Sequence, residues 1–211
     1  MKSEIATGEI AEKRTTESHF DDIENADSVP HYKGVSFGSV LLELEEFEID
    51  DLPHDPMHII LEGLAKYHCI DLFQRLLDGL DGNRTSIDEI NLRLKYFDYG
   101  NKSRNKPLPI QDTILNDKTS LRWTAAMTWT FTMFSPFILE DIVDTEHEDF
   151  KFFNLLRKIC LICFANEISN EALEKLDLYI KEYVERYLRA NTLSNVPKLH
   201  YLTHLVEQIK R

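Results

Sequence analysis

Four side chains able to ligate a metal ion lie in two pairs that are far apart in the sequence, one pair at residues 55–58 and the other at residues 200–204. Asp55 and His58 form a DxxH pair, and His200 and His204 form an HxxxH pair. Residues three or four apart on a helix share one face, so each pair can reach a single ion. Zn²⁺ takes four N, S or O ligands, which the three histidines and either Asp55 or water can supply. If the two ends of the fold meet, the pairs can close one zinc site and clamp the domain.

Each of these residues also has a role that needs no metal. Aspartate is a preferred N-cap, and Pro56 after Asp55 suits the first position of a helix. His58 can cap or hydrogen-bond locally, and His200 can flank the apolar stripe of the last helix. From the residue types alone, both interpretations stay open.

A second group that can do chemistry is a run of bases, in which five bases face only one acid, Asp98. They are Arg93, Lys95, Lys102, Arg104 and Lys106. Such a cluster can contact the phosphates of DNA. Surface loops also carry bases that bind no nucleic acid, so a solvated surface is the alternative.

The remaining reactive residue types form no recognisable catalytic group. Cys160 and Cys163 make a CxxC, but it stands inside an apolar run without the Gly or Pro of a zinc or redox turn. We therefore expect these two cysteines and Cys69 to be core residues. The odd number of cysteines argues against a secreted disulfide framework. The scattered aspartates lack the context of a two-metal site, so no catalytic residue is predicted.

Helical periodicity and capping signals predict the elements that position these residues. The helices begin at Asp55, at a capping box of Ser86 with Glu89, and again further along the chain. No internal repeat, Gly-rich phosphate loop or alternating strand pattern is found, so we expect an all-α, irregular bundle of about six helices. The expected ranges are 55–80, 86–100, about 120–135, about 147–167, 170–190 and from about 195 onward, with a short helix within 39–47.

Charge divides the chain into two parts. Residues 1–51 carry a net charge of −10, whereas residues 52–211 carry −3. We expect residues 1–33 to be an acidic, poorly structured arm and residues 34–211 to be the helical domain, in which Gly63 loosens the first long helix. The longest uncharged run has 17 residues, below the ~20 that a membrane span needs. No apolar signal segment follows Met1, so we expect a soluble intracellular protein.

Several short motifs follow one another in an order that resembles a known family. The block LPHDPMHIILEG is followed by FDYG, NKP, an apolar helix and PKLHYLTH, at residues 52–63, 97–100, 105–107, 121–129 and 197–204. This order resembles a large family derived from cut-and-paste DNA transposases, related to CACTA-like elements, with LPxDxMHxxLEG and PKxHxxxH blocks. The resemblance covers roughly residues 30–211.

The resemblance implies a helical domain inserted before the last Glu of an Asp-Asp-Glu nuclease on an RNase H-like sheet. It maps Asp55 and His58 onto a C/DxxH motif at the start of the insertion, and His200 and His204 onto a His pair at its end, which form a zinc-type clamp in related recombinases. The chain also departs from the family. It has no Arg-Phe-Glu block after His204 and no aspartate between residues 27 and 50, and Tyr183-Val184 replaces the His-His of the fifth helix.

From these observations we expect a transposase-derived helical insertion domain that is catalytically inactive alone and lies in the nucleus. Zinc is the expected cofactor. DNA is the expected partner, or else a protein or a second copy of the chain, with neither a membrane nor a small-molecule substrate. Two alternatives stay open. The chain is a domesticated protein-interaction module with the acidic arm as its binding tail, or it is part of an active strand transferase whose catalytic residues lie outside it.

Overall fold

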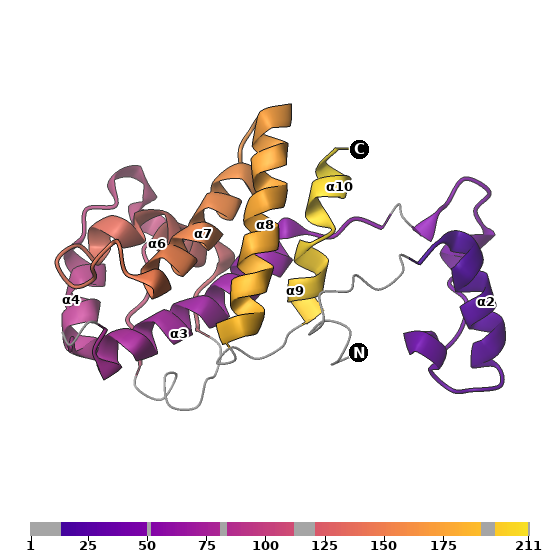
Figure 1. Cartoon of the computed structure of the whole chain (residues 1–211), viewed down its shortest axis with the longest axis horizontal. Coiled ribbons are helices and arrows are strands. Elements are labelled where there is room, and N and C mark those ends of the chain that lie inside the picture. The colour runs from indigo at the N-terminus through magenta and orange to yellow at the C-terminus, as the bar shows by residue number, and fades with distance from the viewer. Residues whose placement is uncertain (1–13, 50–51, 81–83, 112–120, 191–196, 211) are drawn as a thin grey trace. The chain divides into compact units, whose positions relative to one another are not determined.

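The computed structural model describes residues 14–49, 52–80, 84–111, 121–190 and 197–210. Its regular elements in these ranges are all helices, which confirms the predicted all-α class (Figure 1). The chain forms two compact units, Met1–His54 and Asp55–Arg211. None of the helices described is both long and apolar enough to cross a membrane.

Unit 1 contains a helix where we expected a poorly structured arm. Helix α2 (Thr16–Ala26) begins with a capping box between Thr15 and Ser18. The buried Asp22 carboxylate pairs with Arg14 and Lys33, each at 3.2 Å. Only three of the eleven residues of α2, Phe20, Ile23 and Ala26, are apolar, which explains why the sequence pattern did not reveal the helix.

The boundary between the units lies after His54, not after residue 33 as expected. Two short 3-10 helices, η1 (Tyr32–Gly34) and η2 (Val40–Glu43), follow α2 within unit 1. The Ile49 N–H donates to Thr16 Oγ1 at 3.2 Å, and Gly38 lies close to the Ile23 side chain. Residues beyond 33 therefore pack on α2 and belong to the same unit.

Unit 2 contains each of the six predicted helices. The first is divided into a π helix, η4 (Met57–Leu64), and α3 (Ala65–Asp78), which Gly79 ends with a φ of 104°. Helix α4 (Ile87–Tyr96) is capped by Ser86 as expected, and the 3-10 helix η5 (Gly100–Asn105) follows it. The others are α6 (Ala125–Ile138), α7 (Glu148–Cys163), α8 (Asn170–Ala190), α9 (Pro197–Leu202) and α10 (Leu205–Ile209).

Helix α6 is buried, as its apolar composition predicts, and extends past Pro136. Three threonine hydroxyls in it donate to carbonyls one turn back. Proline has no N–H to give to the Thr132 carbonyl, and the Ser135 hydroxyl donates to that carbonyl instead, at 3.1 Å. The Arg157 guanidinium donates to the next carbonyl, that of Met133, and so joins α7 to α6.

The packing of unit 2 brings its first and last helices together. Helices α7 and α8 lie side by side, with α10 against α8 (Figure 1). Helix η4 contacts α6 and α9. One apolar core joins η4 to α7, α8, α9 and α10, and a second joins α3, α4, α6 and the start of α7. The predicted meeting of the two ends of the bundle is therefore present at the level of helices.

Candidate functional site

The DxxH pair lies at the start of the π helix, with Asp55 two residues before η4 and His58 in its first turn. Asp55 caps this helix as predicted, because its Oδ1 accepts from the Met57 N–H at 2.7 Å and its carbonyl accepts from the Ile59 N–H. Further along, the Ala65 N–H reaches the Ile60 carbonyl, five residues back. The loosening expected at Gly63 thus takes the form of a π helix. Such turns are rare and occur frequently at functional sites.

The His58 imidazole stands between two carboxylates. Its Nδ1 lies 2.6 Å from Asp55 Oδ2, and its Nε2 lies 3.5 Å from Glu62 Oε2. The hydrogen bond from His58 is the main reason why the pKa of the Asp55 carboxyl is lowered. All three side chains reach solvent.

The HxxxH pair converges on one point. The Nε2 atoms of His200 and His204 are 3.1 Å apart, with the rings nearly perpendicular. Without a cation, one ring must donate a proton to the other, which requires opposite tautomers. An ion about 2.0–2.1 Å from both nitrogens would see them at roughly 100°, which suits two ligands of a tetrahedral zinc. The pair therefore fits half of a zinc site.

The expected sixth helix is broken between these two histidines. Helix α9 ends at Leu202, and α10 begins at Leu205. The Thr203 hydroxyl donates to the His200 carbonyl at 2.7 Å, and the His204 N–H turns back to Tyr201. A threonine hydroxyl that competes for a backbone carbonyl in this way favours a helix break.

A lysine that the sequence analysis did not single out connects the two motif blocks. The Lys198 ammonium on α9 donates to the Glu62 carbonyl of η4 at 3.0 Å. A Cβ at Gly63 would overlap the Lys198 Cδ and lie 3.1 Å from the His58 carbonyl oxygen. Gly63 therefore leaves the room that the lysine stem occupies. The only sequence signals were a glycine inside an apolar helix and a base directly after Pro197.

The four predicted ligands are brought together only in part. Each pair is formed, and the helices that carry the pairs touch. Within the described ranges, however, no three or more His, Cys, Asp or Glu side chains form a group that could hold a metal ion. A single site made of all four residues remains a prediction.

The five bases predicted to contact DNA fall into two groups: four lie at the surface or are half-buried, and Arg93 is bound to other groups of the protein. Lys95, Arg104 and Lys106 are exposed, and Lys102 is half-buried with its ammonium 5.2 Å from the centre of the Trp129 ring. Arg93 instead pairs with Glu89 at 2.8 Å and donates to the Glu140 carbonyl. Arg93 therefore anchors α4, and the other four bases carry the candidate phosphate contacts.

The cysteines lie where the sequence analysis placed them. Cys69 and Cys160 are fully buried and Cys163 is half-buried. Burial raises the pKa of the Cys163 thiol to about 12 and raises that of Cys160 as well. Because the thiolate is the reactive form, these side chains act as core residues.

A buried histidine was not foreseen. His68 Nδ1 lies 3.2 Å from the Tyr183 hydroxyl, and its ring packs 4.3 Å from that of Phe152. Burial lowers the pKa of His68 to about 3. The ring is therefore neutral at physiological pH and joins α3, α7 and α8 inside the core.

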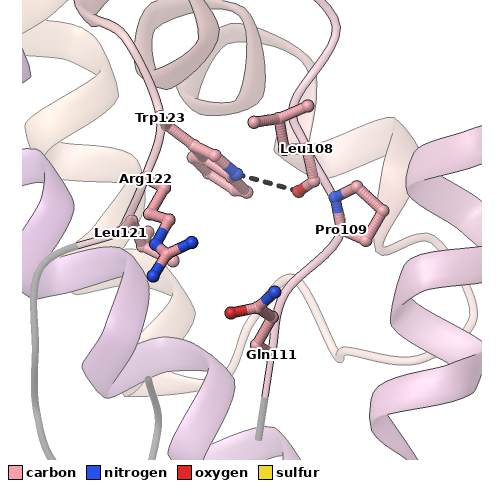
Figure 2. Close-up of a pocket in the computed structure, with 6 residues that line it drawn as sticks. All are labelled: Leu108, Pro109, Gln111, Leu121, Arg122 and Trp123. Atoms are coloured by element: carbon pink, nitrogen blue, oxygen red, sulfur yellow. Dashed lines mark hydrogen bonds between the residues drawn. The ribbon is translucent and has the colours of Figure 1, made fainter. Parts of the chain in front are cut away.

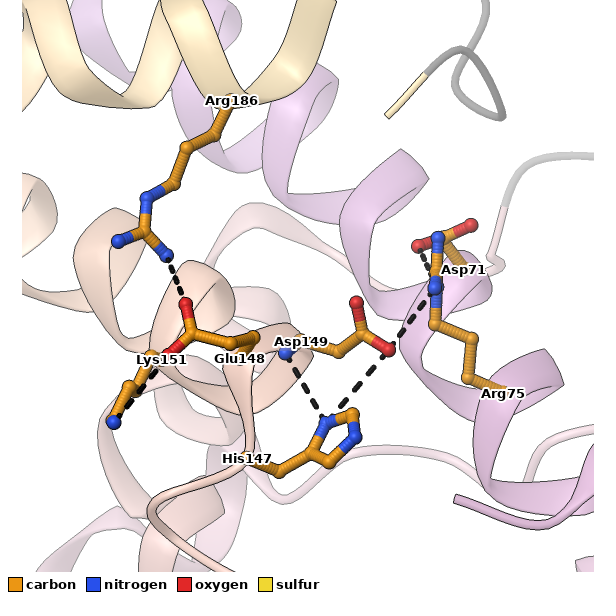
Figure 3. Close-up of polar contacts among 7 residues, drawn as sticks. All are labelled: Asp71, Arg75, His147, Glu148, Asp149, Lys151 and Arg186. Atoms are coloured by element: carbon orange, nitrogen blue, oxygen red, sulfur yellow. Dashed lines mark hydrogen bonds and ion pairs between the residues drawn. The ribbon is translucent and has the colours of Figure 1, made fainter. Parts of the chain in front are cut away.

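Two arginines link helices of unit 2 through ion pairs. Arg75 on α3 pairs with Asp71 and with Asp149 at the start of α7, and Arg186 on α8 pairs with Glu148 (Figure 3).

A pocket of about 270 Å³ lies between the segments 108–111 and 121–123 (Figure 2). The Trp123 indole closes one side by donating to the Leu108 carbonyl. None of the predicted site residues lines this pocket.

Comparison with models of protein families, with curated proteins and with solved structures found no match to this chain.

Proposed function

We propose that this chain is a helical domain derived from a DDE-type, CACTA-like DNA transposase. In this proposal the domain is not itself an enzyme. It acts in the nucleus, where it shapes and contacts a DNA channel. The proposal rests on the motif order described above, with LPHDPMHIILEG and PKLHYLTH at its two ends.

One structural observation carries the proposal. The Lys198 side chain of the second block occupies the space above Gly63 of the first, and donates to the carbonyl of the neighbouring Glu62. This contact gives a physical reason why the glycine of the first block and the lysine of the second occur in the same sequence: the lysine needs the space that the glycine leaves. A domain clamped in this way is suited to hold two neighbouring segments of a larger protein at a fixed separation. Zinc held by His58, His200, His204 and Asp55 would strengthen the same clamp.

The bases around η5 are the proposed DNA contact. Lys95, Arg104 and Lys106 are exposed, and unit 2 is close to neutral overall, so a local basic cluster can attract phosphates. Each phosphate contact releases condensed counterions, and the affinity therefore falls steeply with salt.

The test is the binding of the full chain to duplex DNA at several salt concentrations. Replacing Lys95, Arg104 and Lys106 together by Gln should reduce the slope of log affinity against log salt by about 2–3. The matched control replaces Lys151, Lys175 and Lys181 by Gln. This removes the same charge from lysines that pair with acids. Equal losses in both variants, or no binding at low salt, would contradict the proposal.

A further inference from the structure

Unit 1 presents apolar side chains to solvent along one short segment. Phe37, Val40 and Leu44 are exposed to 81%, 74% and 58%. The segment is nevertheless held in place, because Gly38 packs near Ile23 of α2 and the Ser39 hydroxyl caps η2. Exposed apolar residues that gather in one place mark interaction sites, whereas single ones are ordinary.

The same segment carries only acidic charge. Residues 37–48, which we name the acidic apolar segment, contain four glutamates and no base. Lys33 and Arg14 are the bases of the described part of unit 1, and both pair with Asp22. The segment therefore combines uncovered apolar surface with negative potential.

This combination determines the class of partner. Nucleic acids and the inner faces of cell membranes are anionic, and the glutamates repel both. A second copy that docks the same segment against itself would bring like charges together. A helix with an apolar stripe flanked by Lys and Arg satisfies both features, since its stripe covers the apolar side chains and its bases face the glutamates.

We propose that the acidic apolar segment binds a basic amphipathic helix of a partner protein. Val40, Leu44 and Phe37 supply the apolar contact, and Glu45 and Glu46 supply charge pairing at its rim. The chain is then a protein-interaction module whatever its ancestry. This inference does not depend on DNA contact, which involves residues of unit 2.

The experiment measures binding of the full chain to a labelled synthetic Leu/Lys amphipathic helix of about 18 residues, by fluorescence anisotropy. A Leu/Glu helix with the same apolar pattern is the matched probe. The Leu/Lys helix should bind and the Leu/Glu helix should not. Val40→Ser with Leu44→Ser leaves the net charge unchanged and should weaken binding about tenfold or more.

Two charge variants separate docking from general attraction. Glu45→Gln with Glu46→Gln should weaken binding, whereas Glu167→Gln with Glu174→Gln, an equal change in unit 2, should not. Equal effects of the two charge variants, or wild-type binding by the serine variant, would overturn the proposal. So would a chain that self-associates through Val40 and Leu44, since the segment would then be covered by a second copy. Melting of each variant should match the wild type, because the altered side chains are exposed.

Discussion

At Gly63 the absence of a side chain decides how two helices meet. Alanine is a better helix former than glycine, so helix propensity alone predicts that Gly63→Ala stabilises by up to about 1 kcal/mol. A Cβ here would instead overlap Lys198 and approach the His58 carbonyl. We expect Gly63→Ala to destabilise unit 2 by about 1–3 kcal/mol in denaturant unfolding.

Gly38→Ala is the control for this change, because its Cβ would meet Ile23 at an ordinary 3.6 Å. It should change the stability little. A stabilising Gly63→Ala would show that the lysine does not occupy that space in solution.

The zinc prediction can be tested at the histidine side chains that would bind the ion. Protein purified without chelator should contain about one zinc per chain, and His200→Ala with His204→Ala should lose the metal and lower the melting temperature. His31→Ala, which removes an exposed histidine of unit 1, is the control. Fewer than about 0.2 zinc per chain, or unchanged melting of the double variant, would count against the site.

The buried His68 makes stability depend on pH. Burial lowers the pKa of the folded side chain to about 3 from an ordinary 6.5, so between these values the unfolded chain binds a proton that the folded chain does not. Its contribution is complete above about pH 6.5 and falls as the pH drops towards 3. From pH 7 to 5 the wild type should lose about 2 kcal/mol more than His68→Gln, measured by urea unfolding. Parallel curves for the two proteins would contradict this assignment.

At the scale of elements, the clamp between η4 and α9 can be isolated by a double-mutant cycle. Lys198→Ala removes both the hydrogen bond to the Glu62 carbonyl and the stem above Gly63. In that background, Gly63→Ala should cost clearly less than in the wild type, because the overlap with the lysine stem is gone and only the 3.1 Å approach to the His58 carbonyl oxygen remains. Additive effects of the two changes in denaturant unfolding would show that the lysine and the glycine do not interact.

The sequence predicted the helices of unit 2 well, for a physical reason. Each expected range in unit 2 contains a helix, and apolar side chains such as Ile60, Leu64 and Phe73 are buried, because a bundle must bury one face of each helix. Capping residues were equally informative at Asp55 and Ser86. Both signals depend only on residues close together in the chain, so they can be recognised in a single sequence.

Features that depend on tertiary contacts could not be predicted. The Lys198 ammonium, which donates to the Glu62 carbonyl of the π helix, lies 136 residues further along the chain. The break between α9 and α10 coincides with the hydrogen bond of the Thr203 hydroxyl to the His200 carbonyl. His68 on α3 hydrogen-bonds with Tyr183 on α8. For the candidate site, each pair was predictable from spacing, whereas the way the pairs approach each other was not.

At the scale of the whole molecule, the two units should unfold separately. Asp22 is buried in unit 1, where it pairs with Arg14 and Lys33, so Asp22→Ala leaves both bases without their partner. We expect it to destabilise unit 1 by about 1–3 kcal/mol, since the two bases are partly exposed. Both tryptophans, Trp123 and Trp129, lie in unit 2. Circular dichroism should therefore show an earlier loss of helix while tryptophan fluorescence keeps its midpoint. A matching shift of both probes would show that the units unfold together.

The contact between Lys198 and Glu62 also has a consequence for protein synthesis. When η4 leaves the ribosome, the partner that covers it has yet to be translated. At about 5–20 residues per second, the gap before α9 emerges is roughly 7–30 seconds. During that interval the apolar side chains of η4, such as Ile59 and Leu61, are not yet packed against α9. The nascent chain should therefore be a substrate for chaperones that bind apolar helices.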